Sequence, residues 1–308
     1  MKNYFFTLAI IFAAIIALIF PQYFLEINGF KLKLLIVPLL QIIMFGMGTT
    51  MSWADFVAVV KTPKAVFVGL ICQFTIMPFV GFVLAYSFDF PPEISAGILL
   101  IGCSPSGLAS NVMAYIAKAN VPLSIAITSC ATLLAPILTP ALMKLLAGQL
   151  IEINFWSMMF DILKMVIAPI IVGLLVNYLF KKYIEKLNRV LPIVSMAGIA
   201  IIIVIITAAG RDSLLSIGKV LIIAVLCHNI LGYILGYWGG RLFGMKEQDC
   251  RTIAIEVGLQ NAGLASGLAL QMGKVATVGL AAALFGPIMN TTGSLLATWW
   301  SKRDPSVS

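Results

Sequence analysis

Long runs of apolar residues, separated by short polar breaks, cover most of the 308-residue chain. A helix that crosses a bilayer needs about 20 mainly apolar residues, and the runs divide into segments of about that length. The first segment is too long for the apolar core of a signal peptide and has no small-residue cleavage motif after it, so we interpret it as a span. The pattern predicts ten membrane-spanning helices, at residues 4–20, 34–51, 65–88, 94–117, 122–147, 154–180, 190–209, 217–243, 250–272 and 276–300.

The charged residues support a membrane protein and suggest its orientation. Only 10% of the residues are charged and 61% are hydrophobic, whereas soluble domains carry about 25% charged residues. The net charge of +8 comes from Lys and Arg residues that lie between apolar runs and form no continuous basic face, which argues against a nucleic-acid partner. With ten spans both termini lie on one side, and a cytoplasmic location places 13 of the 20 basic residues inside. We therefore expect a multi-pass protein of the inner (plasma) membrane with both termini in the cytoplasm.

The two halves of the chain share short stretches in the same order, separated by about half its length. Chance could produce any one of them in such an apolar sequence, but four at nearly one spacing favour an internal repeat. With five spans in residues 1–150 and five in residues 151–308, the second half enters the membrane from the opposite face. Many secondary transporters have this inverted-repeat architecture. The matches are Gly107-Leu108-Ala109-Ser110 with Gly263-Leu264-Ala265-Ser266, Lys64 and Cys72 with Lys219 and Cys227, Val37-Pro38-Leu39 with Leu191-Pro192-Ile193, and Pro136-Ile137 with Pro287-Ile288.

The fourth and ninth spans, which correspond across the repeat, both contain residues that interrupt a helix. The fourth contains the stretch 102–107, with two glycines and Pro105, which lacks a backbone N–H. The ninth contains the stretch 256–263, with two glycines and three polar side chains. Irregular backbone survives in a membrane only inside protein or beside a cavity. Paired interruptions therefore predict two discontinuous helices that cross near the bilayer middle and form the binding site.

Most acidic residues lie in loops or at span ends, but Glu256 does not, and a lone carboxylate within a span is a functional candidate. One alternative is a Glu at the membrane interface, because Arg251 is only five residues earlier. Oxygen-bearing side chains surround it in the predicted core, and such donors suit a hard cation such as sodium. Ser124 and Thr128 share a helix face, which ordinary packing could also explain. The other donors are Gln73, Ser110, Asn111, Gln260 and Asn261. The positive helix ends after each break would attract a carboxylate-bearing substrate.

Two motifs resemble the bile acid:sodium symporter family over essentially the whole chain: Ser110-Asn111-Val112-Met113 after the glycine-rich break, and Ala254-Ile255-Glu256-Val257-Gly258-Leu259-Gln260-Asn261. The resemblance implies an all-α fold of ten spans, with a panel domain (spans 1, 2, 6 and 7) and a core domain (spans 3–5 and 8–10). It also implies two sodium sites and a substrate site between the domains. The first sodium site would use Ser110, Asn111, Ser124, Thr128 and Glu256; the second would use Gln73, Glu256, Gln260 and the carbonyls of Val257 and Leu259. The substrate would lie near Leu108, Asn261, Met289 and Asn290.

The chain departs from bile-acid-transporting relatives around the substrate. Those relatives often have Gly-Gly-Thr where this chain has Ser106-Gly107-Leu108, and Trp-His-Asn where it has Ile288-Met289-Asn290. Both changes remove polar groups from the predicted substrate cavity and leave the implied ion ligands in place. The sequence thus predicts sodium-coupled symport of an organic anion, either bile-acid-like or a small carboxylate such as pantoate or a 2-oxo acid.

A proton-coupled transporter and an intramembrane enzyme are the alternative functions. A proton-coupled transporter or antiporter could share the architecture, but these usually place two acids, or an acid and a Lys, in the core. An intramembrane enzyme would need a pair such as Ser106 and His228, and His228 aligns with Gln73 as a polar core position. We expect no enzyme activity and no organic cofactor. The sequence leaves the oligomeric state open and is compatible with a monomer.

Overall fold

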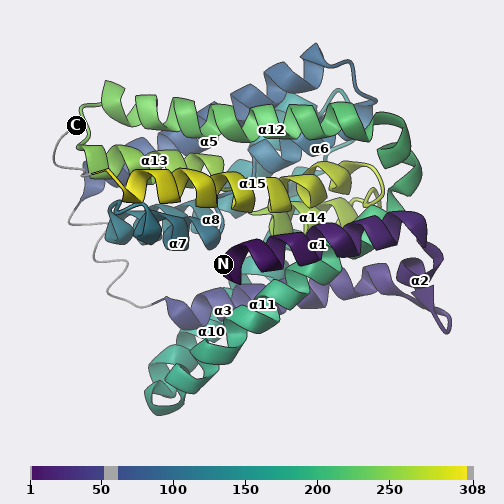
Figure 1. Cartoon of the computed structure of the whole chain (residues 1–308), viewed down its shortest axis with the longest axis horizontal. Helices are drawn as coiled ribbons and strands as arrows, with labels where there is room; N and C mark the ends of the chain where they lie inside the picture. The colour runs from purple at the N-terminus through teal and green to yellow at the C-terminus, as the bar shows by residue number, and fades with distance from the viewer. Residues whose placement is uncertain (1, 52–61, 304–308) are drawn as a thin grey trace.

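A computed structural model describes residues 2–51 and 62–303. Apart from two strands of two residues each, every regular element in these ranges is helical (Figure 1), so the prediction of an all-α protein is confirmed. The elements are α1 Lys2–Ile19, α2 Gln22–Leu25, β1 Glu26–Ile27, β2 Phe30–Lys31, η1 Leu32–Leu35, α3 Ile36–Thr50, α5 Pro63–Ser87, α6 Pro92–Gly102, α7 Ala109–Ile116, α8 Val121–Ala147, α9 Phe155–Ile162, η2 Leu163–Ile167, α10 Ala168–Leu179, α11 Lys181–Ala209, α12 Arg211–Leu242, α13 Glu247–Gly258, α14 Ala262–Gln271 and α15 Val278–Ser301.

Seven helical segments of the described residues are long and apolar enough to cross a membrane. They are Leu32–Thr50, Pro63–Ser87, Val121–Ala147, Phe155–Leu179, Leu187–Ala209, Arg211–Leu242 and Val278–Ser301. Each matches one of the ten predicted spans. The other three correspond to α1 and to two pairs of shorter helices, α6 with α7 and α13 with α14. The count of ten spans and the inverted repeat stay predictions.

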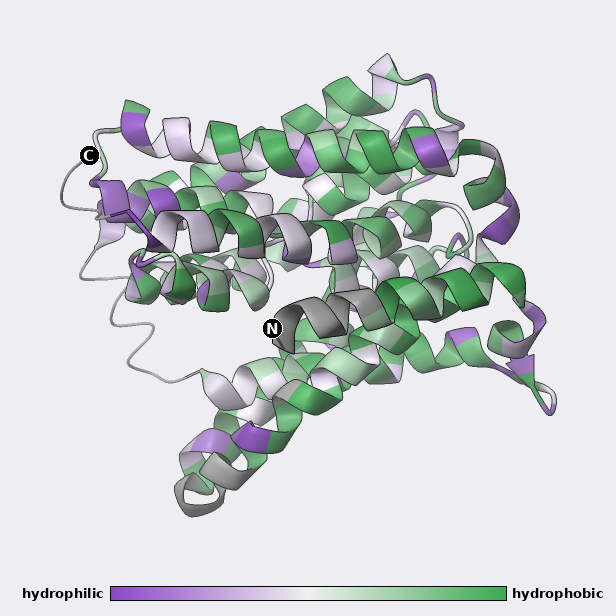
Figure 2. Ribbon diagram, in the orientation of Figure 1, coloured by the Kyte–Doolittle hydropathy of each residue, from purple (hydrophilic) through white to green (hydrophobic). Residues whose placement is uncertain are grey.

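The helices form an elongated bundle. Most residues along the helices are apolar, and polar residues gather mainly at the helix ends (Figure 2). On one side α3 packs against α10 and α11, and α11 packs against α1. On the other side α12 packs against α13, α5 and α15, and α5 packs against α6 and α8 (Figure 1). The four elements of the broken pairs lie within this second group. Between α1 and α3 the chain makes a hairpin of β1 and β2, where Asn28 and Gly29 adopt the positive φ values that a tight turn requires.

Glycines let the backbones of α3 and α10 come into direct contact. A Cβ atom added to Gly48 would lie 2.2 Å from the carbonyl oxygen of Ile170, and one added to Gly173 would lie 2.3 Å from that of Phe45. Small residues commonly mediate such close helix contacts in membranes, where packing rather than the hydrophobic effect holds helices together. The α3–α10 contact therefore depends on the absence of side chains at both positions.

Gly48→Ala is expected to destabilise the protein by about 1–3 kcal/mol, because the added methyl group would force the two backbones apart. Gly46→Ala is the matched control in the same helix, since its Cβ would lie 3.4 Å from the Ser195 hydroxyl, at ordinary contact distance. Thermal unfolding in detergent measures both. Equal unfolding temperatures for the two variants would contradict this account of the contact.

Candidate functional site: a buried carboxylate between two broken helices

Two breaks in helical structure meet each other through their backbones. The first lies between α6, which ends at Gly102, and α7, which begins at Ala109; the second lies between α13 and α14. The Gly107 N–H donates to the Leu259 carbonyl at 3.1 Å, and the Asn261 N–H donates to the Pro105 carbonyl at 2.8 Å. Ser106 and Gln260 thus pair as an antiparallel bridge. Each break satisfies backbone groups that the other leaves free, which irregular backbone inside a membrane requires.

Polar contacts also join the two broken helices at both of their ends. Where α6 begins, Glu93 pairs with Lys274 and accepts from the Thr277 hydroxyl at 2.6 Å; both partners lie in the loop that follows α14. At the opposite end, Arg251 of α13 donates to the Ala117 carbonyl just after α7, at 3.3 Å. The α6–α7 and α13–α14 pairs are therefore held together at three levels: one outer end, the opposite outer end, and the bridge between the two breaks.

The Glu256 side chain is fully buried next to the bridge and is surrounded by hydroxyl groups. Ser124 Oγ donates to Glu256 Oε1 at 2.5 Å. Thr128 Oγ1 and Ser106 Oγ donate to Oε2 at 2.7 and 2.6 Å. The donors come from α8 and from the first break, whereas Glu256 belongs to α13, so three segments distant in sequence converge on one carboxylate.

The remaining predicted donors of the first sodium site lie in the same cluster. Ser110 Oγ is 3.2 Å from Thr128 Oγ1, and the Asn111 side-chain amide lies within hydrogen-bond distance of Ser124 Oγ, at 2.8 Å. All five predicted residues are therefore linked through hydrogen bonds. Thr132, the next member of the same α8 face, does not reach Glu256 and donates to the Thr128 carbonyl of its own helix at 2.8 Å.

The nearest basic residue in the sequence contacts another acid. Arg251 is itself buried, with 2% exposure, and its Nε donates to Glu247 Oε1 at 2.8 Å. Every hydrogen-bond partner that the structure gives Glu256 is a neutral hydroxyl. A buried carboxylate without a cationic partner is costly, so this carboxylate offers a place for a mobile cation surrounded by oxygen atoms.

The side chains predicted for the second sodium site also meet. Gln73 Nε2 donates to Gln260 Oε1 at 2.9 Å and to the Ser104 carbonyl at 3.0 Å. Gln260 Nε2 donates to the Val257 carbonyl at 2.6 Å, and the Leu259 carbonyl accepts the bridge bond described above. Gln73 Oε1 is buried and accepts no hydrogen bond within the described part of the chain. An unpartnered buried acceptor is unfavourable, and its lone pairs are free for a cation.

The residues predicted to bind the substrate divide into two groups. Leu108 and Asn261 follow the two sides of the bridge, and the Asn261 side chain accepts from the Leu264 N–H at 2.9 Å as the cap of α14. Met289 and Asn290 lie on α15, which packs against both α7 and α14. Met289 is buried, and Asn290 Nδ2 donates to the Gly286 carbonyl of its own helix at 2.7 Å.

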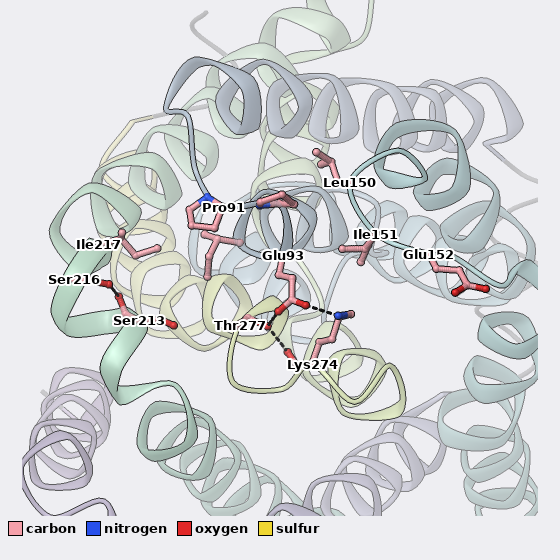
Figure 3. Close-up of a pocket in the computed structure, with 12 residues that line it drawn as sticks. Pro91, Glu93, Leu150, Ile151, Glu152, Ser213, Ser216, Ile217, Lys274 and Thr277 are labelled. Carbon is pink, nitrogen blue, oxygen red and sulfur yellow. Dashed lines mark hydrogen bonds and ion pairs between the residues drawn. The ribbon is translucent and has the colours of Figure 1, made fainter.

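A pocket of about 580 Å³ lies elsewhere, at the end of the bundle where α6 begins (Figure 3). It is formed by the starts of α6 and α12, the loop after α8 and the loop before α15, and its polar lining includes Glu93, Lys274, Thr277, Ser213 and Ser216. None of the four predicted substrate residues lines it. The pocket and the predicted substrate site are thus separate features.

Two residues that the sequence analysis did not assign take part in this site. Ser106 contacts Glu256 directly, as described above. Asn229 of α12 donates through Nδ2 to the Gly258 carbonyl at 2.8 Å, at the end of α13, and accepts from the Thr292 hydroxyl at 2.5 Å. Its neighbour His228 is buried, with Nε2 2.9 Å from the Met77 carbonyl. In the sequence, the adjacent polar residues His228 and Asn229 within an otherwise apolar predicted span were the signal that could have identified Asn229.

Comparison with known proteins identifies the family of the chain. The model of the family described as the sodium bile acid symporter family matches residues 37–217. The chain belongs to that family. It is 40% identical to the "Uncharacterized sodium-dependent transporter YocS" of Bacillus subtilis (strain 168), over 96% of this chain and 90% of the relative.

More distant relatives include a human protein and a plant protein. The chain is 34% identical to the human "Ileal sodium/bile acid cotransporter", over 79% of this chain and 71% of the relative. It is 33% identical to the Arabidopsis thaliana "Probable sodium/metabolite cotransporter BASS1, chloroplastic", over 86% of this chain and 66% of the relative. All three are named as sodium-dependent transporters or cotransporters and none as an enzyme. The chain is thus a member of a sodium-dependent transporter family with several helices fit to cross a membrane.

Proposed function

We propose that the protein is a symporter that uses sodium to carry an organic anion across the inner membrane, with both termini in the cytoplasm. The observation that carries the proposal is Glu256: a fully buried carboxylate whose hydrogen-bond partners are all neutral hydroxyls. Coulomb attraction is strong at low dielectric, and a sodium ion there would balance the buried charge. The hydroxyls can rotate so that their lone pairs face the ion instead of the carboxylate.

We propose two coupling ions, both of which are transported with the substrate. The first is bound by Ser110, Asn111, Ser124, Thr128 and Glu256. The second is bound by Gln73, Gln260, Glu256 and the carbonyls of Val257 and Leu259, and the unpartnered Gln73 Oε1 supports it. Glu256 serves both sites, so each ion depends on the same negative charge. The bridge between the breaks lies beside both donor sets, and we infer that sodium binding orders it.

The transport step follows from the proposed architecture of ten spans in two inverted halves. Spans 1, 2, 6 and 7 form a panel, which corresponds to α1, α3, α9–α10 and α11. The other spans form a core that carries both sodium sites. Alternating access requires that the core moves against the panel after sodium binds. The contacts between the broken helices at three levels would let the core move as one body.

The substrate is proposed to bind between panel and core, near Leu108, Asn261, Met289 and Asn290. The α14 helix begins at Ala262, and its N-terminal N–H groups favour a carboxylate. The human relative is named as a sodium/bile acid cotransporter and the Arabidopsis thaliana relative as a probable sodium/metabolite cotransporter. The apolar Leu108 and Met289 favour a small carboxylate, such as pantoate or a 2-oxo acid, at least as much as a bile acid.

A proton-coupled transporter of the same architecture is the second candidate, because a buried Glu can also carry a proton. Proton-coupled transporters usually place a second acid or a Lys beside the first acid, but among the described residues the hydrogen-bond partners of Glu256 are hydroxyl groups. This composition favours sodium.

Thermal unfolding of the purified protein in detergent, titrated with sodium or potassium at constant ionic strength, tests the choice. Sodium that binds only the folded state should stabilise it by about 2.7 kcal/mol at 100 times its dissociation constant. Potassium should have no such effect. A response to pH without a response to sodium would favour the proton-coupled transporter. Sodium-driven uptake of candidate carboxylates into proteoliposomes then identifies the substrate.

Gln73→Ala is expected to remove one of two sodium-binding events. It deletes the free Oε1 of the second site, and the hydroxyl cluster of the first site contains no contact to Gln73. The sodium dependence of uptake should lose cooperativity, with a Hill coefficient that falls toward one. Thr75→Ala is the matched control on α5, because the Thr75 hydroxyl bonds only to the Ile71 carbonyl of its own helix. Complete loss of sodium binding in Gln73→Ala would contradict two separable sites.

A further inference from the structure

Ser106 occupies the point where the first break, the second break and Glu256 meet. It lies between α6 and α7, is fully buried, and forms the backbone bridge with Gln260. Its hydroxyl donates to Glu256 Oε2 at 2.6 Å. The same segment contacts the second donor set, because the Ser104 carbonyl accepts from Gln73. Ser106 is therefore shared between the bridge and the carboxylate on which both proposed ions depend.

The Ser106 hydroxyl has no local structural task that would explain it. A Ser shortly before a helix commonly caps the helix by accepting from a backbone N–H. Here α7 begins without a side-chain cap, and the hydrogen bond given for the Ser106 side chain goes to Glu256. Nearby, Ser110 Oγ donates to the Gly107 carbonyl at 2.8 Å and serves the local turn. A hydroxyl buried beside an uncompensated carboxylate is better explained by a ligand of that carboxylate's counter-ion.

We propose that Ser106 Oγ is a further oxygen ligand of the sodium ion at Glu256 and connects that ion to the bridge; this inference rests on the proposed sodium-coupled function. Ser106 and Thr128 both lie within hydrogen-bond distance of Oε2, so a cation bound at this oxygen is within reach of both hydroxyls. Rotation of the Ser106 hydroxyl turns a lone pair toward the ion without any movement of the backbone. Because Ser106 is held to Gln260 by the bridge, the ion then binds both breaks at once.

The consequence concerns the substrate side of the site. Leu108 lies two residues after Ser106, and Asn261 directly follows Gln260. A ligand at Ser106 therefore transmits sodium occupancy through the bridge to two residues of the proposed substrate site. The other side-chain ligands of this ion lie on α7, α8 and α13, outside the bridge, whereas Ser106 is part of it.

The test is the sodium midpoint of thermal stabilisation for Ser106→Ala and Ser106→Cys in the full-length protein. Loss of one oxygen that binds a charged partner should raise the midpoint about tenfold. The Cys thiol has nearly the size of the hydroxyl group but is a soft donor that a hard cation disfavours, so it should give a similar shift. Ser95→Ala is the matched control: Ser95 is a buried α6 residue whose hydroxyl bonds to the Ala85 and Phe90 carbonyls, and it should keep the wild-type midpoint.

A ligand role and a merely structural role give different results. If Ser106 only supports the fold, its variants should unfold at lower temperature with and without sodium but keep the wild-type sodium midpoint. An unchanged or lower midpoint would overturn the proposal, because the hydroxyl would then solvate only the ion-free carboxylate. If Ser106→Ala does not fold, Ser106→Cys decides. Failure of the wild-type protein to respond to sodium would overturn the proposed function itself, whereas a normal wild-type response with unaltered Ser106 variants would overturn only this inference.

Discussion

Sodium is expected to lose its stabilising effect in the Glu256→Gln protein. The substitution keeps the side-chain size and an oxygen that can accept from the surrounding hydroxyls, but it removes the negative charge that both proposed ions share. Breaking one partner from a buried ion pair costs about 3–5 kcal/mol, which corresponds to at least about a 100-fold loss of sodium affinity. Sodium-driven uptake should fall by a similar factor at any sodium concentration near the wild-type midpoint.

In the absence of sodium, the same substitution should have the opposite effect on stability, which provides an independent test. Without sodium, a neutral amide is less costly to bury than a carboxylate with no cationic partner, so Glu256→Gln should be at least as stable as the wild type. With sodium, the wild type should become the more stable of the two. Thermal unfolding of both proteins, with and without sodium, measures this crossover.

Glu26→Gln is the matched control, because it makes the same chemical change at an exposed position of the β1–β2 hairpin. It should respond to sodium as the wild type does. A Glu256→Gln protein that sodium still stabilises fully would place the coupling ion away from Glu256 and would overturn the proposed site.

Periodicity and helix-breaking residues predicted two local features around this candidate site. Ser124 and Thr128 share a face of one long helix, and both reach Glu256. Pro105 predicted a break that the structure places between α6 and α7. These predictions succeeded because regular helices fix the direction of their side chains, and because a missing N–H interrupts a helix wherever it lies.

The features that the sequence analysis missed depend on irregular backbone or on how deeply a side chain is buried. Ser106 lies in a non-helical segment, where no period indicates the direction of a side chain, so its contact with Glu256 follows only from the pairing of the two breaks. In the sequence, Arg251 indicated only that the membrane interface is near, yet its side chain is buried. Glu247 lies four residues earlier on the same helix, and this spacing could have predicted an ion pair with Arg251. Two of the three predicted spans outside the seven, 94–117 and 250–272, correspond to pairs of short helices, and the third corresponds to α1.

Arg251 joins three segments at the end of the bundle opposite Glu93. Its guanidinium donates to Glu247 and to the carbonyls of Ala117, Trp300 and Arg303, at 2.8–3.3 Å. These partners belong to α13, the end of α7 and the end of α15. A planar guanidinium with five donors can serve several acceptors at once. Arg251 thus fixes α13, which carries Glu256, relative to α7, which carries Ser110 and Asn111.

Arg251→Met should therefore destabilise the protein by about 3–5 kcal/mol, the usual cost of breaking a buried ion pair. Met fills much of the volume but leaves three carbonyls without their donor. Glu247 keeps its contacts with Arg241 at 2.5 Å and with the Tyr237 hydroxyl at 2.6 Å, so part of the cluster survives. Arg251→Lys should be intermediate, because an ammonium group can pair with Glu247 but cannot present the same set of donors.

Equilibrium unfolding in detergent measures the loss of stability, and Lys246→Met is the matched control, since Lys246 is an exposed basic residue next to the start of α13. It should stay within about 0.5 kcal/mol of the wild type. If Arg251 positions the sodium donors as well as the fold, the folded fraction of Arg251→Lys should also need more sodium for half-maximal stabilisation. A normal sodium midpoint in that variant would limit Arg251 to stability, and Arg251→Met with wild-type stability would show that the bridge between the breaks holds these helices without it.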